Sequence, residues 1–376
     1  MDFRLDGEAA DLYNLADTTL ARQLPPERIA ADSALSGGVA SDAWTALIGA
    51  GVIDALLPEQ LGGAGLDSYA AHAVVRAGAE HGSMVPTLPV VTAILVLSRE
   101  PSSFGNLLRD VSAGRSLVTS AVREPGGRWI QDAVTTAVVD GEVLRLNGRK
   151  AFVQLGRQAS HVLVPARTPE GIVIAVVPTD AEGITWAGHP VQSHVPAASM
   201  HLDEVALPAT AVLGTPADGH ARYLDRAMSI SMCAAAAGTV HRALESAVEH
   251  VSARKQFGRA IGSFQAVKMQ LADAYITSSA LRSVADAAAW QLSMGHNDDV
   301  RRTVAAANYL MSRDLIPAVL ACQHVLGGTG MDTDHPMHRF VITALDIANL
   351  LGGVEACLDR ATAWSAADST PYARAE

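Results

Sequence analysis

The spacing of hydrophobic and polar residues changes along the chain. Residues 1–115 carry Ala and Leu at helical intervals, interrupted at residues 58–65 (PEQLGGAG), where four of eight residues are Gly or Pro. From residue 116 to 215 the pattern shortens to β-branched segments. Three turn signals separate these segments: Asp140-Gly141, Asn147-Gly148 and Pro169-Glu170-Gly171. The pattern predicts an N-terminal helical domain (1–115) and a small middle β-domain (116–215).

From residue 216 onward the sequence is helical again, and the expected helices are long. Residues 222–254 contain no proline and one internal glycine, Gly238. Further stretches with helical spacing follow at 263–294, 300–325 and 336–366, the last interrupted by Gly352-Gly353. Such lengths, joined by short glycine-marked turns, are typical of a four-helix bundle. We therefore expect an α+β fold in three domains, with a C-terminal helical bundle over residues 216–376.

Composition argues against several classes of protein. Hydrophobic residues make up 49% of the 376 residues and charged residues 18%, which favours a compact fold over disorder. A net charge of −11 without a long basic stretch argues against a nucleic-acid surface. No apolar run reaches the roughly 18 residues of a membrane span, and the acidic N-terminus does not resemble a signal peptide. We expect a cytoplasmic protein.

Cysteine and histidine positions indicate neither disulfides nor a metal centre. The three cysteines, Cys233, Cys322 and Cys357, are scattered without CxxC spacing, as expected for buried thiols in a reducing compartment. His335 and His338 stand with two aspartates in one loop, but no second, distant ligand set accompanies them. We therefore predict no metal site.

The most informative segment is RKQFGRAIGSFQAVKMQLAD at residues 254–273, where an Arg-x-x-Phe-Gly turn joins two long expected helices. Other short motifs are PEQLGGAG (58–65), REPG (123–126), NGRK (147–150), HLDEV through Pro208 to Leu213-Gly214 (201–214), and GGTG followed by HPMHR (327–339). In content and order these motifs resemble those of the acyl-CoA dehydrogenase family. A single motif of this kind is a weak signal, whereas several in the correct order are a strong one. The resemblance implies the same three-part fold.

The resemblance also implies an activity, the FAD-dependent oxidation of an acyl-CoA thioester between Cα and Cβ. In the family a glutamate removes the α-proton while the β-hydrogen leaves as hydride to flavin N5. The two positions where members carry this glutamate correspond here to Leu351 and Met228. Neither side chain accepts a proton, so no catalytic residue is assigned. Glu355, one helical turn past Leu351, is a candidate displaced base, although a solvated acid on a helix surface is the commoner role.

The contacts to the flavin ring depart from the family pattern as well. Arg123 and Trp129 stand where members have small polar residues that admit the cofactor, and Phe152 and Gln154 represent the Trp-x-Thr that packs on the ring. Phe152 is able to stack on a flavin and Gln154 to donate a hydrogen bond. The alternative for Phe152 and Trp129 is a place in the core of the β-domain.

A second set of flavin contacts is retained. In the family's tetramers, the Arg-x-x-Phe-Gly and Gly-Gly-x-Gly turns reach across a subunit interface to the pyrophosphate and adenine of the partner's FAD. An arginine fork suits phosphate oxygens, and paired glycines let backbone amides approach an anion. His324 replaces the usual glutamine, and the alternative role of Arg254 is a helix-end ion pair. The cofactor-binding residues predicted in this way are Arg254, Gln256, Phe257, His324, Gly327 and Gly328.

These losses and retentions together resemble the glutamate-lacking subunit of actinobacterial heterotetrameric acyl-CoA dehydrogenases, which act on sterol side chains and other bulky acyl-CoAs. On this hypothesis, a homologous partner carries the catalytic glutamate, FAD is shared at the interface, and electrons pass to an electron-transfer flavoprotein. Two alternatives stay open. One is a stand-alone flavoenzyme of this fold with a displaced base or flavin oxygen chemistry, and the other is a non-redox structural homologue.

Overall fold

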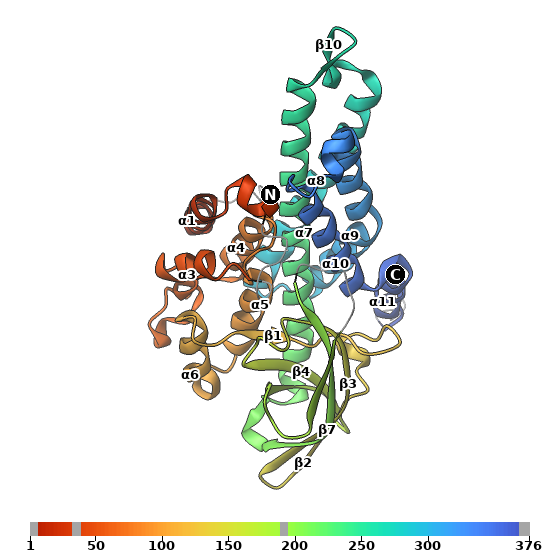
Figure 1. Cartoon of the computed structure of the whole chain (residues 1–376). Coiled ribbons are helices and arrows are strands. Elements are labelled where there is room, and N and C mark those ends of the chain that lie inside the picture. The colour runs from red at the N-terminus through yellow and green to blue at the C-terminus, as the bar shows by residue number, and fades with distance from the viewer. Residues whose placement is uncertain (1–6, 32–38, 189–194, 368–376) are drawn as a thin grey trace, which may run out of the picture.

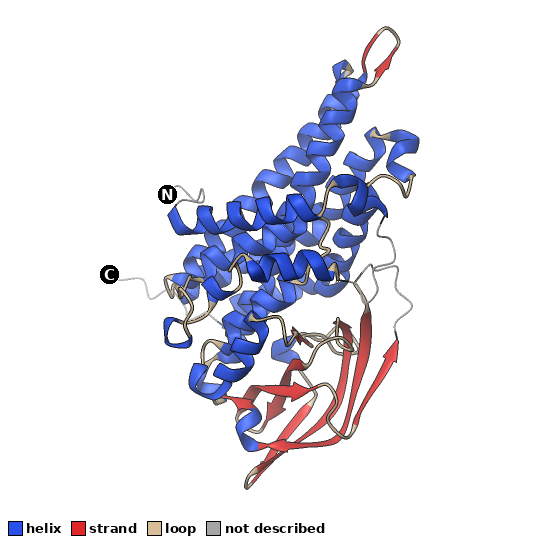
Figure 2. Ribbon diagram, turned by 60° about the vertical axis from the view of Figure 1, so that its left-hand side comes forward, coloured by secondary structure: helices blue, strands red, loops and turns tan. Residues whose placement is uncertain are grey.

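The fold class expected from the sequence is confirmed by the structure, a computed structural model that describes residues 7–31, 39–188 and 195–367. Figure 1 shows the N-terminal helices (red to orange) packed beside the long helices of the C-terminal part, with the β-domain (yellow to green) below them. Figure 2 shows most strands gathered into one body under the helices, and a short two-stranded hairpin at the opposite end of the molecule. One large cluster of buried side chains connects the two helical parts, and a second fills the interior of the β-domain.

The N-terminal part consists of short and medium helices. They are α1 (Gly7–Gln23), α2 (Pro26–Ala31), α3 (Ser41–Gly49), α4 (Ser68–Glu80), α5 (Thr87–Leu97) and α6 (Pro101–Ser112). Helix α5, with the sequence TLPVVTAILVL, is almost wholly buried because it packs between α4, α6 and the central helix of the C-terminal part. Helix α4 begins at a cap, where the Asp67 carboxylate accepts the amide N–H groups of Tyr69 and Ala70.

The β-domain is built on one mixed sheet. Its strands are β1 (Val118–Ser120), β2 (Thr136–Asp140), β3 (Val143–Gln154), β4 (His161–Thr168), β5 (Gly171–Pro178), β6 (Ile184–Gly188), β7 (Ala197–Pro208) and β8 (Val212–Leu213). The order across the sheet is β6-β7-β3-β2-β4-β5-β8, and β1 pairs in parallel with β4. The DG and PEG signals are confirmed as hairpin loops, joining β2 to β3 and β4 to β5.

The turn expected at Asn147-Gly148 is wrong. These residues lie inside β3, at a register shift opposite β7. The Asn147 side chain holds the irregularity by bonding to the side chain and backbone N–H of Glu204 on β7. Gly148 is required there because its φ is 154° and a Cβ would come within 2.5 Å of Thr135 Oγ1. An Asn-Gly pair therefore marks a bulge here, as glycine inside a strand often does.

Two of the sequence motifs meet in the interior of the β-domain. The Lys150 ammonium donates to Glu124 Oε1 and to the Pro165 carbonyl oxygen, both at 2.6 Å, and both charged side chains are about 1% exposed. The Glu124 carboxylate also accepts the backbone N–H groups of Val134 and Thr135 at 2.7 and 3.0 Å. REPG and NGRK thus form a buried ion pair that ties the loop after β1 to β3 and β4.

The C-terminal part is a bundle of long helices: α7 (His220–Ala253), α8 (Gln265–Ser293), α9 (Asn297–Val325), α10 (Met337–Leu351) and α11 (Gly353–Ala367). Helix α7 packs against α4, α5, α8, α9 and α10. Gly238 permits the close approach of α4, since a Cβ there would lie 2.5 Å from the Arg76 carbonyl oxygen. Figure 1 shows α7 running from the β-domain to a small hairpin at the far end of the molecule.

The interruption expected at Gly352-Gly353 within residues 336–366 is confirmed, and it divides this stretch into α10 and α11. Gly352, with φ 82°, ends α10, and Gly353, with φ 89°, begins α11 after a bend of 44°. A left-handed residue ends a helix, and glycine adopts that conformation without strain. Across the described ranges, no single helix is long and apolar enough to span a membrane, and only α10 with the start of α11 has that length and composition, as a bent pair.

Candidate cofactor site

The Arg-x-x-Phe-Gly turn is a small hairpin at the outer end of α7. Strands β9 (Lys255–Gln256) and β10 (Arg259–Ala260) pair around Phe257 and Gly258, whose φ angles are 53° and 77°. This two-residue turn requires positive φ at both positions, which only glycine adopts without strain. Phe257 is nevertheless 91% exposed, with its ring edge-on to Phe264 at 6.1 Å. An exposed phenylalanine with a strained backbone makes few stabilising contacts within this chain. This combination indicates that the side chain contacts another molecule.

Arg254 lies directly after the last residue of α7 and is exposed. Throughout the part of the chain that the structure describes, its side chain makes neither an ion pair nor a hydrogen bond. The helix-end ion pair considered above is therefore not formed there. Gln256, two residues on, is exposed as well. Both side chains are placed to meet a group that approaches the hairpin from outside, and a guanidinium fork suits the oxygens of a phosphate.

A surface groove of about 650 Å³ lies between α8, α9 and the turn after α9. One of its lining residues, Gln270, lies five residues past the start of α8, the helix that follows the hairpin. Side chains from α9 and from the turn after it line the rest. They include Leu320, His324, Gly327 and Met331. The groove therefore lies on the surface formed by α8, α9 and the turn after α9.

The backbone of the Gly-Gly-x-Gly turn is open to this region. A Cβ built on Gly327 or Gly328 would meet nothing within 4 Å. Met331, at the end of the same turn, is 73% exposed. Sequence reasoning found the glycines and His324 but missed Met331 and Gln270. The available signals were the position of Gln270 inside the 254–273 signature and that of Met331 directly after GGTG.

The two positions that correspond to a catalytic glutamate are apolar and inaccessible. Leu351 is 0% exposed and Met228 is 3% exposed. The Leu351 carbonyl oxygen accepts a hydrogen bond from Arg360 Nη2 at 2.8 Å. Glu355, the candidate displaced base, is exposed on the first turn of α11. Neither position supplies a general base, and Glu355 has the environment of a solvated surface acid.

Large side chains fill the junction between the β-domain and the bundle. The Trp129 ring is buried, and its indole N–H donates to Asp225 Oδ1 at 2.5 Å. The Arg360 guanidinium lies over the same ring at 5.2 Å. Asp225 is itself buried, and burial raises the pKa of its carboxyl group despite the opposing hydrogen bond from Trp129. Trp129 is thus a core residue, but it belongs to the large cluster shared with the helices and not to the core of the β-domain, where it was expected.

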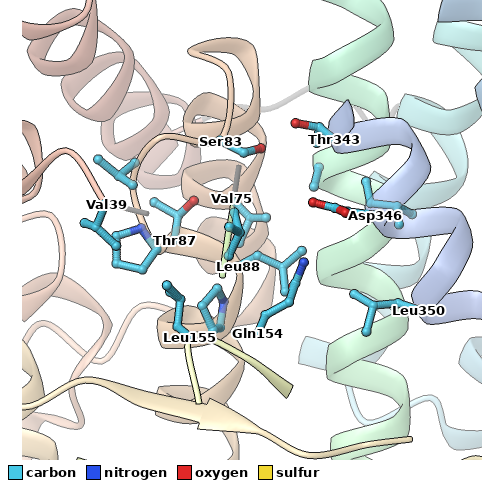
Figure 3. Close-up of a pocket in the computed structure, with 16 residues that line it drawn as sticks. Val39, Val75, Ser83, Thr87, Leu88, Gln154, Leu155, Thr343, Asp346 and Leu350 are labelled. Atoms are coloured by element: carbon cyan, nitrogen blue, oxygen red, sulfur yellow. The ribbon is translucent and has the colours of Figure 1, made fainter. Parts of the chain in front are cut away.

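A smaller cavity, of about 60 Å³, lies between α4, α5, the end of β3, α7 and α10. Figure 3 shows the Asp346 carboxylate and the Ser83 and Thr343 hydroxyl groups facing the same space, with Gln154 reaching toward it from β3. Most of the remaining lining is aliphatic. Asp346 and Asp225 are buried acids that sequence reasoning missed, because nothing in their local sequence separates them from surface acids on a helix.

Comparison with known proteins agrees with this geometry. The family model for the C-terminal domain of acyl-CoA dehydrogenases matches residues 226–358. The acyl-CoA dehydrogenase FadE28 of Mycobacterium tuberculosis is 33% identical over 315 residues, covering 82% of this chain and 88% of FadE28. FadE27 of the same organism is 31% identical over 373 residues, covering 96% and 97%. The chain belongs to the acyl-CoA dehydrogenase family.

Solved structures show the same relationship. The ChsE4–ChsE5 complex of Mycobacterium tuberculosis contains a chain that superposes with a TM-score of 0.90 at 30% identity, covering 99% of this chain and all of that one. A variant of the Tcur3481–Tcur3483 steroid ACAD superposes with a TM-score of 0.86, also at 30% identity, covering 96% and 99%. Both structures are named for two components, the first as a complex and the second as a steroid ACAD.

FAD is the cofactor of the acyl-CoA dehydrogenase family, and this chain fits only one end of it. The exposed Arg254, the open glycine backbone and the adjoining groove suit a pyrophosphate and an adenine. The interior does not suit a flavin ring. Its cavity of about 60 Å³ compares with the roughly 300–1,000 Å³ of typical ligand pockets, and Trp129 and Arg360 fill the neighbouring junction.

Proposed function

We propose that this chain is the non-catalytic subunit of a heteromeric FAD-dependent acyl-CoA dehydrogenase, a heterotetramer that introduces an α,β double bond into an acyl-CoA. The observation that carries the proposal is a contrast within one chain. Leu351 and Met228, which stand at the positions of the catalytic base, are apolar and buried. The exposed hairpin, in contrast, keeps the residues that in the family contact the FAD of another subunit.

The division of labour follows from the side chains. A homologous partner subunit supplies the glutamate and the compartment for the flavin ring. This chain supplies the Arg254 charge to the pyrophosphate of that FAD, and the open backbone at Gly327 and Gly328 offers amide N–H groups beside it. In the groove, Met331 and Leu320 provide apolar contact for the adenine, and His324 provides a polar contact. Phe257 and Gln256 contact the same FAD from the hairpin.

The relatives support a partner and a class of substrate. Two similar structures are two-component complexes, and one of them is described as a steroid ACAD. On this basis, the substrate is a bulky acyl-CoA such as a sterol side chain, and the electron acceptor is an electron-transfer flavoprotein. The setting we infer is the cytoplasm.

The stand-alone reading has one observation in its favour, the Asp346 carboxylate on the wall of the interior cavity. A carboxylate there is a general base of the correct chemistry, whereas Glu355 is exposed. This second candidate requires the chain to hold its own flavin, and to lose its activity in Asp346→Asn while Glu355→Gln stays active.

The test is the FAD content and oligomeric state of the chain, purified alone and together with the homologous subunit encoded beside it. We expect a colourless lone chain and a yellow tetramer with about one FAD for every two subunits. In that tetramer, Arg254→Gln lowers the flavin content, and Lys255→Gln, which removes a neighbouring exposed charge from the same hairpin, does not. A yellow homotetramer with one FAD per chain would refute the proposal.

A further inference from the structure

A histidine side chain caps the N-terminus of α10. The backbone N–H of Met337, the first residue of this helix, donates to His335 Nδ1 at 3.2 Å. The intervening residue, Pro336, has no side-chain acceptor, and Met337 is 0% exposed, so water does not replace the bond if it is lost. A ring nitrogen accepts a hydrogen bond only when it carries no proton. The cap therefore requires the neutral form of His335, with its proton on Nε2.

The surroundings of His335 favour this neutral form. The N-terminus of the 15-residue helix α10 is the positive end of its dipole, which repels a cation. Burial, followed by the nearby charges of His250 on α7 and His338 on α10, lowers the pKa of His335, and Asp332 opposes the shift. Arg339, the next charged residue of α10, points to the backbone of α2. Because the pKa in the folded state lies below the ordinary value of about 6.5, the stability from the cap is complete above that pH and is lost as the pH falls through the folded-state pKa.

Hydrogen bonds connect this cap to the Gly-Gly-x-Gly turn. The His335 N–H donates to the Asp332 carbonyl oxygen at 3.1 Å, and the Asp332 N–H donates to the Thr329 carbonyl oxygen at 3.2 Å. On the helix side, His338 Nδ1 donates to the His335 carbonyl oxygen at 2.7 Å. His335 therefore stands between α10 and residues 327–331, the turn that borders the groove. A change in the position of His335 reaches this turn through its own backbone.

We propose that neutral His335 holds the Gly-Gly-x-Gly turn in the shape that meets the cofactor, and that its protonation in mild acid releases the turn. A proton on Nδ1 removes the acceptor of the Met337 N–H and places a cation beside the positive end of α10. The ring then turns away from the helix, and residues 332–336 rearrange with it. The effect on FAD rests on the proposed function, in which this turn contacts the FAD of the partner subunit. The release of the cap concerns this chain alone.

The first test is hydrogen exchange of the full chain, in complex with its partner where the two co-purify. After correction for the intrinsic pH dependence of exchange, we expect the opening constant of residues 327–340 to rise at least about ten-fold between about pH 7.5 and about pH 5.5. His335→Asn keeps an acceptor oxygen that does not titrate, so its protection stays the same at both values. His335→Ala has no acceptor and is open at both. His241→Asn, which removes an imidazole 44% exposed on α7, responds as the wild type does.

The second test measures the FAD that the complex retains after gel filtration at the same two pH values. We expect the wild-type complex to lose FAD in acid, with an affinity about ten-fold lower, and the His335→Asn complex to keep it. If the complex holds no FAD at neutral pH, the proposed function fails, whereas the exchange experiment still decides whether the cap responds to pH. Equal protection of the wild type at both pH values, an equal acid response in His335→Asn, or retention of FAD in acid despite opening of the turn overturns the proposal.

Discussion

The buried ion pair of the β-domain leads to a quantitative prediction. Replacing Lys150 by methionine keeps much of the side-chain length but leaves the Glu124 carboxylate charged in an interior where both groups are about 1% exposed. The change also removes the donor of the Pro165 carbonyl oxygen. Breaking one side of a buried ion pair costs about 3–5 kcal/mol. Because Glu124 keeps the N–H groups of Val134 and Thr135, we expect about 3 kcal/mol.

The assay is native-state hydrogen exchange, since a chain with several structural parts does not unfold in a single two-state step. A loss of about 3 kcal/mol raises the opening constant of the affected strands roughly a hundred-fold. The loss of protection should concentrate in β2, β3 and β4, which carry or flank the pair. The long helices of the bundle should change much less.

Two further variants complete this test. Lys268→Met removes another lysine, one that is exposed on α8, and should leave exchange in the β-domain unchanged. The double variant Glu124→Gln, Lys150→Met should recover part of the loss, because no unpaired charge remains buried. If Lys150→Met lowers protection no more than Lys268→Met does, the pair is not what holds these strands together.

Three further predictions concern packing, pH and the hairpin. Gly238→Ala should lower thermal stability by about 1–3 kcal/mol, since its Cβ would meet the backbone of α4, whereas Gly49→Ala, with nothing within 4 Å, should be neutral or slightly stabilising. Burial raises the pKa of Asp286 from 3.8 to about 6, so the folded state holds this proton more tightly and the stability from this group falls as pH rises from about 4 to 6, by roughly 3 kcal/mol. Urea midpoints across that range should fall less in Asp286→Asn, and equal slopes in both proteins would count against the reasoning. Phe257→Ala should leave the melting temperature of the chain unchanged, because the ring is 91% exposed, yet lower the FAD content of the complex.

The sequence predicted the class and order of the elements because these depend on local spacing, and it failed where distant contacts decide. The Asn-Gly pair at residues 147–148 looked like a turn, but its conformation is held by Glu204 on another strand. Asp225 and Asp346 carry no local signal that predicts a buried acid, and only packing places them inside. No local pattern reports such contacts.

The motifs that identify the family perform physically different tasks in this chain, and only some of those tasks depend on a flavin inside it. Glu124 and Lys150 hold the β-domain together whether or not a cofactor is bound, so their presence says nothing about catalysis. Leu351 shows the opposite, since a buried leucine is compatible with the fold but not with proton abstraction. Phe257 fits neither case, because it is strained, exposed and contributes no core packing. A residue of that kind is explained only by something that binds to it from outside, and for this reason the hairpin, and not the interior, carries the functional argument.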